Sequence, residues 1–355
     1  MVRFHTWAVI TLAILFPLST VARTEDAKDK EVTKTNSAGD TRYNFGGFSE
    51  PGNWYKGNLH LHSTMSDGKF DPQTTVEVYR KAGYDFTALS DHIGGFWDKQ
   101  KKEYRPLVYP LDILNKPGFL VIPAIEYDTT QNGETIHMVA VGPGYDRWMA
   151  KEQDPSAAMK IWWDAGAFTF FAHPHWSLDS TEVLEAMPFL PAVEVFNYAT
   201  ALGEGIRGNS QLHWDRLLRM KRPVLGVATD DSHHAGTDSG GGWVMVKAKQ
   251  LTAESIVAGL RSGNFYFSSG PRLNQVYADA KGNLHIECSP VRTIRAMAGV
   301  GQVNSASASK GKTIDNATLK WDPKWPFVRV ECVEDDGRTA WSQGMVRIQE
   351  TKQEK

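Results

Sequence analysis

Apolar runs typical of β-strands alternate with amphipathic segments typical of helices through the middle of this chain. The strand-like runs are NLHLHS, YDFTALS, FLVIPAIEY, HMVAVG, AFTFFAH, AVEVFN and PVLGVATD. The helix-like segments among them are DPQTTVEVYRKAG, PSAAMKIWWDAG, STEVLEAMPFL and SQLHWDRLLRMK. The first two start at the pairs Asp71-Pro72 and Asp154-Pro155, which suit a helix N-terminus. This βαβα order predicts an α/β fold in which parallel strands are covered by helices.

The alternation breaks at two places. The connection between FLVIPAIEY and HMVAVG is too short for a helix, so we expect a hairpin with its turn at Asn132-Gly133. After a last helix-like segment, TAESIVAGLRSG, the pair Gly270-Pro271 marks a domain boundary. Beyond it, short strand-like runs with turn residues predict a small all-β, sandwich-like C-terminal domain over 271–355, following a larger domain over 46–270.

The first residues have the pattern of an export signal. Arg3 and His5 precede the apolar run WAVITLAILFPLSTVA, which is short for a membrane span and ends in small residues. We therefore predict a signal peptide over 1–22 and a periplasmic or extracellular protein without stable membrane insertion, with an uncleaved anchor as the alternative. Residues 23–45 are polar and poor in apolar side chains, which predicts a disordered leader.

Composition changes the picture in three respects. The 355 residues, 41% of them hydrophobic, are enough for one large domain and a smaller one. The formal net charge is −2 and no basic stripe is visible, so neither nucleic acid nor an anionic membrane is an expected partner. The two cysteines, Cys288 and Cys332, follow strand-like runs; a disulfide in an oxidising compartment and two separate buried thiols are both open.

Histidine and acidic residues cluster just after the strand-like runs. Nine of the eleven histidines lie between His60 and His234, and most have an Asp or Glu nearby in the sequence. Histidine is the commonest metal ligand, and in barrels of alternating strands and helices the catalytic groups project from the carboxyl ends of the strands. The pattern therefore predicts a multinuclear metal site at that end of the sheet.

Several of these residues have local reasons to be ligands. His60 and His62 are two apart, so both point to one side of a strand while Leu61 turns into the core. Asp67 lies in the turn SDG, which suits either a metal ligand or an Asx turn. Glu126 ends the apolar run VIPAI, where burying a carboxylate costs free energy unless a metal or another partner compensates.

The next histidines leave alternatives open. His92 follows the strand-like run DFTALS and is a candidate ligand. His137 enters a strand alone, and by itself such a histidine is more often a hydrogen-bonded structural residue. Pro174 forces a bend between His173 and His175, so only one of these two need face the centre.

The run TDDSHH closes the pattern. Four candidate polar residues lie in this run, at the end of the last strand-like segment before Gly270: Asp230, Asp231, His233 and His234. We expect one carboxylate and one histidine of this run to bind metal, with the others supporting them or exposed.

The motifs, in this order, resemble those of the PHP (polymerase and histidinol phosphatase) superfamily of metal-dependent phosphoesterases. The matching elements are HLHS with the following SDG, SDH after a strand, an isolated Glu, AHP and the D-x-H-like TDDSHH. From Lys56 to about Trp341, including LTAESIVAGLRSGNFYFSSGP and the C-terminal strands, the chain is more narrowly similar to CehA/McbA-type metallohydrolases.

This resemblance implies a distorted (β/α)7 PHP barrel that holds two or three divalent metal ions. Position by position, the ligands it implies are His60, His62, Asp67, His92, Glu126, His137, His173, His233 and one of Asp230 and Asp231. The usual closing motif, Asp-x-His, favours Asp231, whereas the position at the strand end favours Asp230.

A ligand set so rich in nitrogen suits Zn, Mn or Fe better than Mg or Ca alone. Ions of this kind lower the pKa of a bridging water, and the resulting hydroxide attacks an ester. We therefore expect an exported metal-dependent hydrolase of a small-molecule phosphoester, or of a carboxyl or carbamate ester, with His175 and His234 as candidate proton donors. The alternative is a catalytically inactive metal-binding or recognition module.

Overall fold

The computed structural model describes residues 45–93, 109–146, 154–203, 206–279 and 281–346, together with the backbone of four short strands. These strands pair as β1 (Thr33–Thr35) with β2 (Thr41–Tyr43), and β5 (Trp97–Asp98) with β6 (Glu103–Tyr104). The predicted signal peptide, 1–22, lies outside the described residues, and of the predicted leader only β1, β2 and Phe45 are described. Within the described ranges, no helix has the length and apolar character needed to span a membrane.

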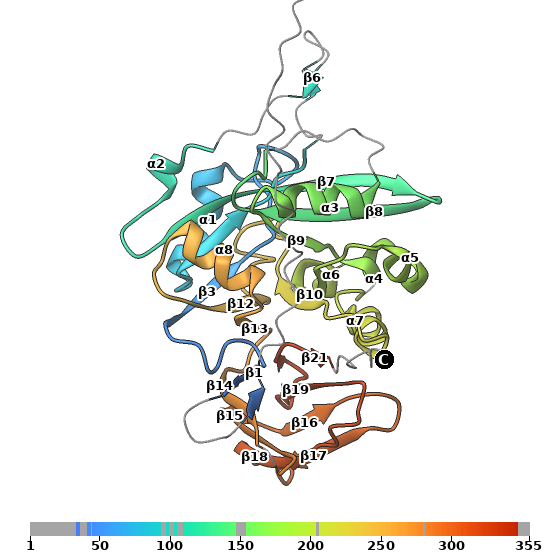
Figure 1. The fold of residues 1–355 in the computed structure, drawn as a ribbon. Helices are drawn as coiled ribbons and strands as arrows, with labels where there is room; N and C mark the ends of the chain where they lie inside the picture. The colour runs from blue at the N-terminus through green and yellow to red at the C-terminus, as the bar shows by residue number, and fades with distance from the viewer. Residues whose placement is uncertain are drawn as a thin grey trace, which may run out of the picture. The chain divides into compact units, whose positions relative to one another are not determined.

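Seven strands lie side by side in the order that the alternating pattern predicts. They are β3 (Asn53–Asn58), β4 (Phe86–Leu89), β7 (Leu120–Gln131), β8 (Glu134–Val141), β9 (Phe168–Phe171), β10 (Ala192–Asn197) and β11 (Leu225–Thr229). Neighbouring strands are parallel, except that β8 is antiparallel to β7 and to β9. β7 and β8 form the predicted hairpin (Figure 1), and its turn residues Asn132 and Gly133 have φ of 54° and 82°. The α/β fold is therefore confirmed, and four of the six pairings among these seven strands are parallel.

The first and last of these seven strands meet beyond their carboxyl ends. The backbone N–H of Asp231 donates to the carbonyl of His60 (2.8 Å), and that of His62 donates to the carbonyl of Ser232 (2.9 Å). The sequence pattern predicts one strand through His62, but β3 ends at Asn58. Beyond that point the chain leaves its pairing with β12 and bonds instead to the segment that follows β11.

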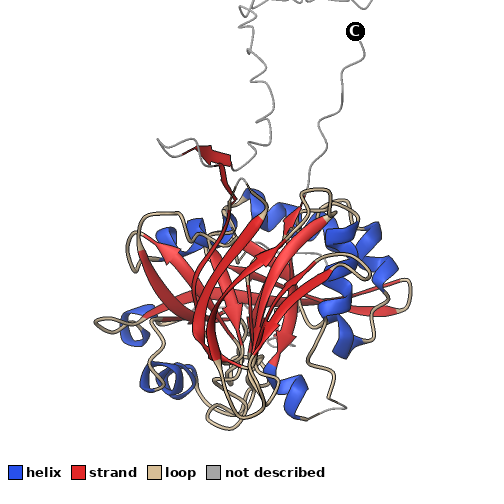
Figure 2. Cartoon of the chain, turned by 90° about the horizontal axis from the view of Figure 1, so that it is seen from below, coloured by secondary structure: helices blue, strands red, loops and turns tan. Residues whose placement is uncertain are grey.

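Five helices occupy the positions of the amphipathic segments: α1 (Pro72–Lys81), α3 (Pro155–Asp164), α5 (Thr181–Ala186), α7 (Gln211–Arg219) and α8 (Ala253–Arg261). Asp71 and Asp154 cap α1 and α3 by accepting hydrogen bonds from backbone N–H groups at 3.0 and 2.8 Å. The short helices α2 (Leu111–Leu114), α4 (Pro174–Ser177) and α6 (Tyr198–Leu202) have no counterpart in the sequence pattern, because about one turn is too short to show a helical period. Figure 2 shows helices flanking the strands.

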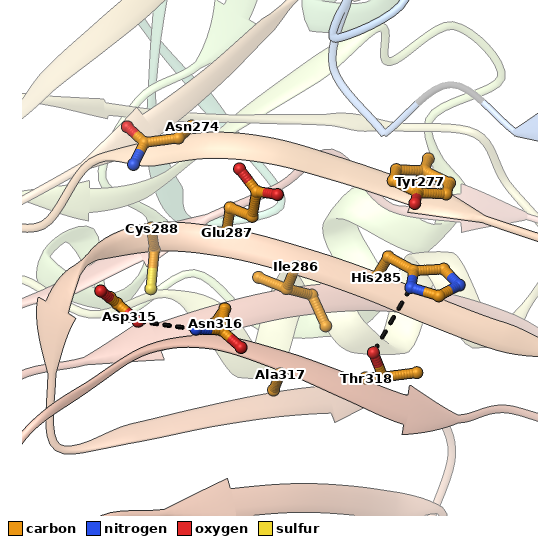
Figure 3. A pocket seen from close by; sticks show the side chains of 10 residues that line it. All are labelled: Asn274, Tyr277, His285, Ile286, Glu287, Cys288, Asp315, Asn316, Ala317 and Thr318. Atoms are coloured by element: carbon orange, nitrogen blue, oxygen red, sulfur yellow. Dashed lines mark hydrogen bonds between the residues drawn. The ribbon is translucent and has the colours of Figure 1, made fainter.

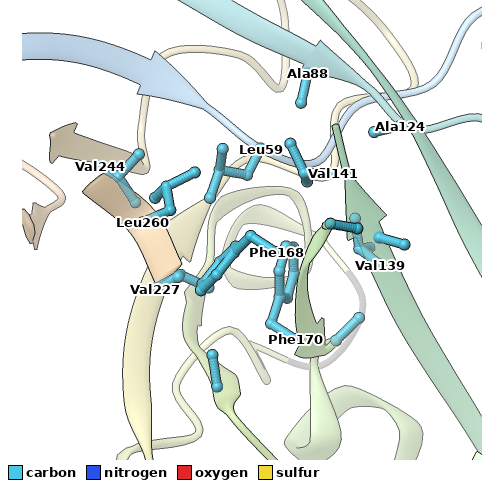
Figure 4. Close-up of a cluster of buried hydrophobic side chains, with 14 of the residues drawn as sticks. Leu59, Ala88, Ala124, Val139, Val141, Phe168, Phe170, Val227, Val244 and Leu260 are labelled. Atoms are coloured by element: carbon cyan, nitrogen blue, oxygen red, sulfur yellow. The ribbon is translucent and has the colours of Figure 1, made fainter. Parts of the chain in front are cut away.

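Buried apolar side chains fill the space between the strands and the helices. Leu59, Val139, Phe168 and Val227 come from four different parts of the seven-strand ladder and are all fully buried (Figure 4). Leu260 of α8 packs into the same cluster. This core holds the carboxyl ends of the strands, and the side chains that follow them, in fixed positions.

The large sheet continues from the seven strands into the C-terminal part of the chain, drawn in orange and red in Figure 1. It runs from β3 through β12 (Trp243–Ala248), β13 (Phe265–Ser268), β20 (Thr339–Trp341), β19 (Phe327–Val333), β16 (Thr293–Met297) and β17 (Val303–Ser307). A second sheet holds β14 (Leu273–Ala278), β15 (Asn283–Val291) and β18 (Ile314–Lys320), and β21 (Met345–Val346) pairs with β19. Strands on both sides of the predicted boundary at Gly270-Pro271 therefore belong to one sheet.

A second apolar cluster lies among the C-terminal strands. It includes Cys288 and Cys332, both buried and present as free thiols. On the outer face of the smaller sheet, Tyr277, His285 and Thr318 form a row beside a shallow cavity of about 380 Å³ (Figure 3). Polar residues on one face and apolar residues on the other are typical of a sheet packed on one side.

Candidate metal centre

Nitrogen and carboxylate ligands from seven neighbouring strands, or from the residues just after them, and from the loop that holds Asp67 converge on one site. The side chains whose ligand atoms fall into groups within 4.8 Å of one another are His60, His62, Asp67, His92, Glu126, His137, His173, Glu194, Asp231 and His233. The set contains nine of the ten candidate ligands named from the sequence; Asp230 is the exception, and Glu194 is an addition. The structure therefore brings together side chains that are up to 173 positions apart, as expected for strand ends on one face of an α/β sheet.

Glu126 lies at the centre of this arrangement. Its carboxylate is buried, and its Oε2 atom lies 3.1 Å from Nε2 of both His60 and His62. Its Oε1 atom lies 2.8 Å from His137 Nδ1 and 3.3 Å from His173 Nε2. Oε2 also lies 3.4 Å from His92 Nε2, so the two oxygens of one carboxylate face two different sets of imidazoles, and Glu126 would be placed to serve more than one ion.

The first group of ligands has atoms without hydrogen-bond partners. Asp231 Oδ1 lies 3.3 Å from His60 Nε2 and 3.1 Å from His62 Nε2. All three atoms are buried, and none has a hydrogen-bond partner among the described residues. Two ligands bound to one tetrahedral ion at about 2.0–2.1 Å lie roughly 3.3 Å apart, so this spacing fits a divalent ion. A bound ion would also relieve the cost of burying unpaired polar atoms.

Asp67, His92 and His233 form a further group next to the first. Asp67 Oδ2 lies 3.4 Å from His233 Nε2 and 3.7 Å from His92 Nε2. The His62 ring stacks between the other two imidazoles, with ring centroids 4.7 Å from His92 and 4.2 Å from His233. Because the Asp67 side chain is 56% exposed, this group lies at the solvent side of the site.

The far nitrogen of most imidazoles is held by a fixed partner, which leaves Nε2 directed at the cavity. The contacts at Nδ1 are His60 to Glu194 (3.2 Å), His62 to Ser66 (3.3 Å), His173 to Ser177 (3.1 Å) and His233 to the carbonyl of Asp231 (2.9 Å). Partners of this kind fix the orientation and tautomer of histidines that bind metal. The donor set therefore fits a metal centre in its orientation as well as in its composition.

Glu194 is a site residue that a search for histidine motifs does not single out. Its carboxylate accepts hydrogen bonds from the backbone N–H of His173 (2.8 Å), from Asn197 Nδ2 (3.0 Å) and from the Thr229 hydroxyl. It also contacts the ring of His60, and it is fully buried. The available sequence signal is its place in the run VEVFN, at the carboxyl end of a strand.

Asp231, and not Asp230, faces the histidines. The Asp230 carboxylate accepts hydrogen bonds from the backbone N–H groups of residues 240–242 (2.7–2.9 Å), from Tyr79 (2.9 Å) and from Asn58 (3.2 Å). It holds the loop after β11 in place and has no contact with an imidazole in the described structure. The backbone of Asp231 is left-handed, with φ of 53°, and the Asp231 carboxylate faces His60 and His62.

The two predicted proton donors lie in different surroundings. His234 lines the cavity, and its side chain is 57% exposed. The Asp238 carboxylate fixes its backbone by accepting from its N–H group (2.9 Å). His175 is exposed, its Nδ1 contacts the carbonyl of Asn209 (2.9 Å), and it is not among the residues that line the cavity. Of the two, His234 is the one that lines the cavity.

Neighbouring charges shift the pKa values of Glu126 and His62 more than burial does. Burial raises the pKa of Glu126, but the neighbouring imidazoles, His60 first, hold it well below its ordinary value. Burial lowers the pKa of His62, but the adjacent Asp231 and Glu126 carboxylates raise it to about 10. In the metal-free protein, protons therefore occupy nitrogens that face carboxylates, and a metal ion that binds there must displace them.

The cavity above these ligands has a volume of about 640 Å³. Besides the ligands, its lining includes Lys69, Trp176, Ala199, Leu202 and His234. A cavity of this size holds a small organic molecule next to the candidate metal ligands.

No protein family model matches this chain. A curated protein that matches part of it is the DNA polymerase/3'-5' exonuclease PolX of Bacillus subtilis (strain 168), which is 31% identical over 86 residues. The match covers 22% of this chain and spans only 15% of the length of PolX.

Three solved structures are similar at low sequence identity. A two-domain protein of Bacteroides vulgatus ATCC 8482, containing a predicted PHP-like metal-dependent phosphoesterase, is 16% identical, with 83% of this chain and 96% of that chain covered and a TM-score of 0.44. A protein of Bifidobacterium adolescentis ATCC 15703, provisionally named a metal-dependent phosphoesterase, is 17% identical, with coverages of 52% and 90% and a TM-score of 0.37. An amidohydrolase of Chromobacterium violaceum with bound sulfate and no metal is 14% identical, with coverages of 58% and 96% and a TM-score of 0.39. Two of these three proteins are thus described as PHP-like or metal-dependent phosphoesterases.

Proposed function

We propose that this protein is a hydrolase of the PHP superfamily that binds two or three divalent ions and cleaves an ester bond with water. The observation that carries the proposal is the convergence of His60 Nε2, His62 Nε2 and Asp231 Oδ1, all buried and without hydrogen-bond partners among the described residues. The division of the Glu126 oxygens between two sets of imidazoles supports more than one ion. The nitrogen-rich donor set favours Zn, Mn or Fe.

When bound, such ions activate water and stabilise negative charge on the substrate oxygens. The chain's own residues hold the ligands and shape the cavity. Glu194 and the serines behind the imidazoles fix the rings, so that their nitrogens need little reorganisation. His234 is placed at the mouth of the cavity, where a proton can be delivered to the leaving group.

A phosphoester is the substrate favoured over a carboxyl or carbamate ester. Four carboxylates line the cavity, Asp67, Glu126, Asp231 and Asp238, and Glu194 lies behind it. Three divalent ions together with Lys69 would outweigh these five negative charges, so a site loaded with three ions is cationic and complements an anionic ester. Carboxyl and carbamate esters are neutral, so the positive charge of the site attracts them less.

The fold and location that we propose follow the same resemblance. The seven strands from β3 to β11, joined between residues 60–62 and 231–232, support a distorted seven-stranded PHP barrel with one antiparallel strand. We also propose that the mature protein is exported and begins near residue 23. Amino-terminal sequencing of the protein secreted by its host tests this, and an intact residue 1 in that fraction would rule out cleavage.

Metal analysis combined with an ester screen tests the function. After metal-replete expression, the purified protein should hold at least two transition-metal ions and turn over a chromogenic phosphoester with added Mn²⁺ or Zn²⁺. Glu126→Gln should lose both metal and turnover, because one shared carboxylate serves two groups of imidazoles. A fully loaded protein with no turnover of any phosphoester, carboxyl ester or carbamate would favour the recognition module instead.

A further inference from the structure

The cavity above the metal centre has two chemically different sides. Trp176, Ala199 and Leu202 give one side an apolar surface, and Lys69 gives the other a cationic group. None of these four side chains belongs to the candidate metal ligands. They are therefore available to select what the metal centre acts on.

The apolar side lies next to the His137 and His173 group. The indole ring of Trp176 meets the ring of His173 edge to face, with centroids 4.9 Å apart and an interplanar angle of 83°. It also lies 6.2 Å from the ring of His137. Leu202, at the end of α6, is 52% exposed although it is large and apolar. An exposed apolar side chain at the mouth of a ligand cavity suits contact with an apolar part of the ligand.

The cationic side lies next to the group of Asp67, His92 and His233. The backbone N–H of Lys69 donates to the carbonyl of His233 (2.9 Å), which fixes the lysine beside that ligand. No ion pair joins its ammonium group to a carboxylate of the described residues, whereas Asp67 points at the imidazoles. Among the described residues that line the cavity, Lys69 is the one Lys or Arg side chain.

We propose that the cavity binds its substrate in one orientation, with an anionic group at Lys69 and an apolar organic group against Trp176 and Leu202. The ligand class is a phosphomonoester of an apolar alcohol, because its dianion presents one more charge than a diester and its organic part requires an apolar surface. The identity of the bond that reacts rests on the proposed function, whereas the orientation rests on the two sides of the cavity.

Two phosphonates that no hydrolase of this kind can cleave separate the two contacts. Phenylphosphonate carries the dianion and an apolar ring, and methylphosphonate carries the dianion with almost no apolar part. Their dissociation constants are measured by calorimetry on the intact, metal-loaded protein and on Lys69→Met, Trp176→Ala and the control Lys324→Met, an exposed lysine of the C-terminal region. Metal content is measured for each variant, so that loss of the centre is recognised.

We expect Lys69→Met to weaken both phosphonates by the same factor, about two- to fivefold, as for one charge contact of an exposed lysine. Trp176→Ala should weaken phenylphosphonate roughly tenfold and leave methylphosphonate within about twofold, since only the ring packs on the indole. Trp176→Phe should restore most of the loss, and Lys324→Met should change neither ligand.

Each other outcome overturns the orientation. Equal weakening of both phosphonates by Trp176→Ala would make the tryptophan structural, and unchanged binding by Lys69→Met would remove the anion contact. Binding does not depend on turnover, which separates the two proposals. A protein that shows the expected pattern but hydrolyses no ester contradicts the proposed function alone, and one that hydrolyses esters without the pattern contradicts the orientation alone.

Discussion

Asp230 and Asp231 are neighbours in the chain, yet substituting each by asparagine should affect different properties. The Asp230 carboxylate accepts five hydrogen bonds, three of them from backbone N–H groups. An asparagine keeps one oxygen, so two or three of these donors would face an amide NH₂ group. A buried donor left unsatisfied costs about 1–3 kcal/mol, so Asp230→Asn should lower the free energy of unfolding by roughly 3–6 kcal/mol. That is a large share of the ~5–15 kcal/mol typical of native proteins.

Asp231→Asn should act on metal binding instead. Its Oδ1 atom has no hydrogen-bond partner among the described residues and faces His60 and His62, so little hydrogen bonding is lost with it. The second oxygen accepts from Asn197 Nδ2 (3.1 Å), a contact that an amide oxygen can keep. Because removal of a supporting partner of a ligand already lowers metal affinity about 10–100-fold, loss of a ligand charge should exceed ~100-fold.

Urea unfolding of the chelator-treated proteins and metal analysis of the loaded proteins measure the two effects separately. Asp112→Asn, at an exposed position in α2, serves as the matched control. The expected pattern is a lower urea midpoint for Asp230→Asn and a lower metal content for Asp231→Asn. Equal losses of metal in the two variants, with equal urea midpoints, would refute the assignment of the two carboxylates.

Two further perturbations probe how the ligands are held and charged. Glu194→Ala should lower metal affinity about 10–100-fold by releasing the His60 ring. Glu194→Gln should lower metal affinity less, because glutamine keeps a hydrogen-bond acceptor. Unchanged metal affinity in the alanine variant would contradict the positioning role of Glu194. Metal affinity should fall as pH is lowered from about 8 to 6, by up to tenfold per pH unit for each displaced proton. The pKa of His62 is raised to about 10, so the metal-free site holds protons in this pH range and must release them when metal binds. Calorimetry in buffers with different ionisation enthalpies counts these protons, and a pH-independent affinity would show that the site is already deprotonated.

The sequence by itself determined the order of elements and the composition of the site. Asp-Pro caps, apolar runs and Asn132-Gly133 act on neighbouring residues, so they specify helices, strands and a hairpin without knowledge of the rest of the fold. The positions of the histidines at strand ends also follow from local pattern, because all parallel strands present their carboxyl ends on one side. This is why His60, His92 and His173 could be assigned to one cavity from sequence.

Only the tertiary structure decided which polar groups touch. Asp230 and Asp231 have the same side chain and adjacent positions, but their carboxylates have different partners. The backbone is left-handed at Asp231, and the loop ten residues later donates hydrogen bonds to Asp230. Glu194 carries no motif, yet it supports His60 because β10 brings it to the same strand end. His175, a candidate by its place in AHPH, turns away because α4 begins at Pro174. Hydrogen bonds and metal coordination act over about 3 Å, so the residues that share a site are fixed by packing between distant segments and not by spacing along the chain.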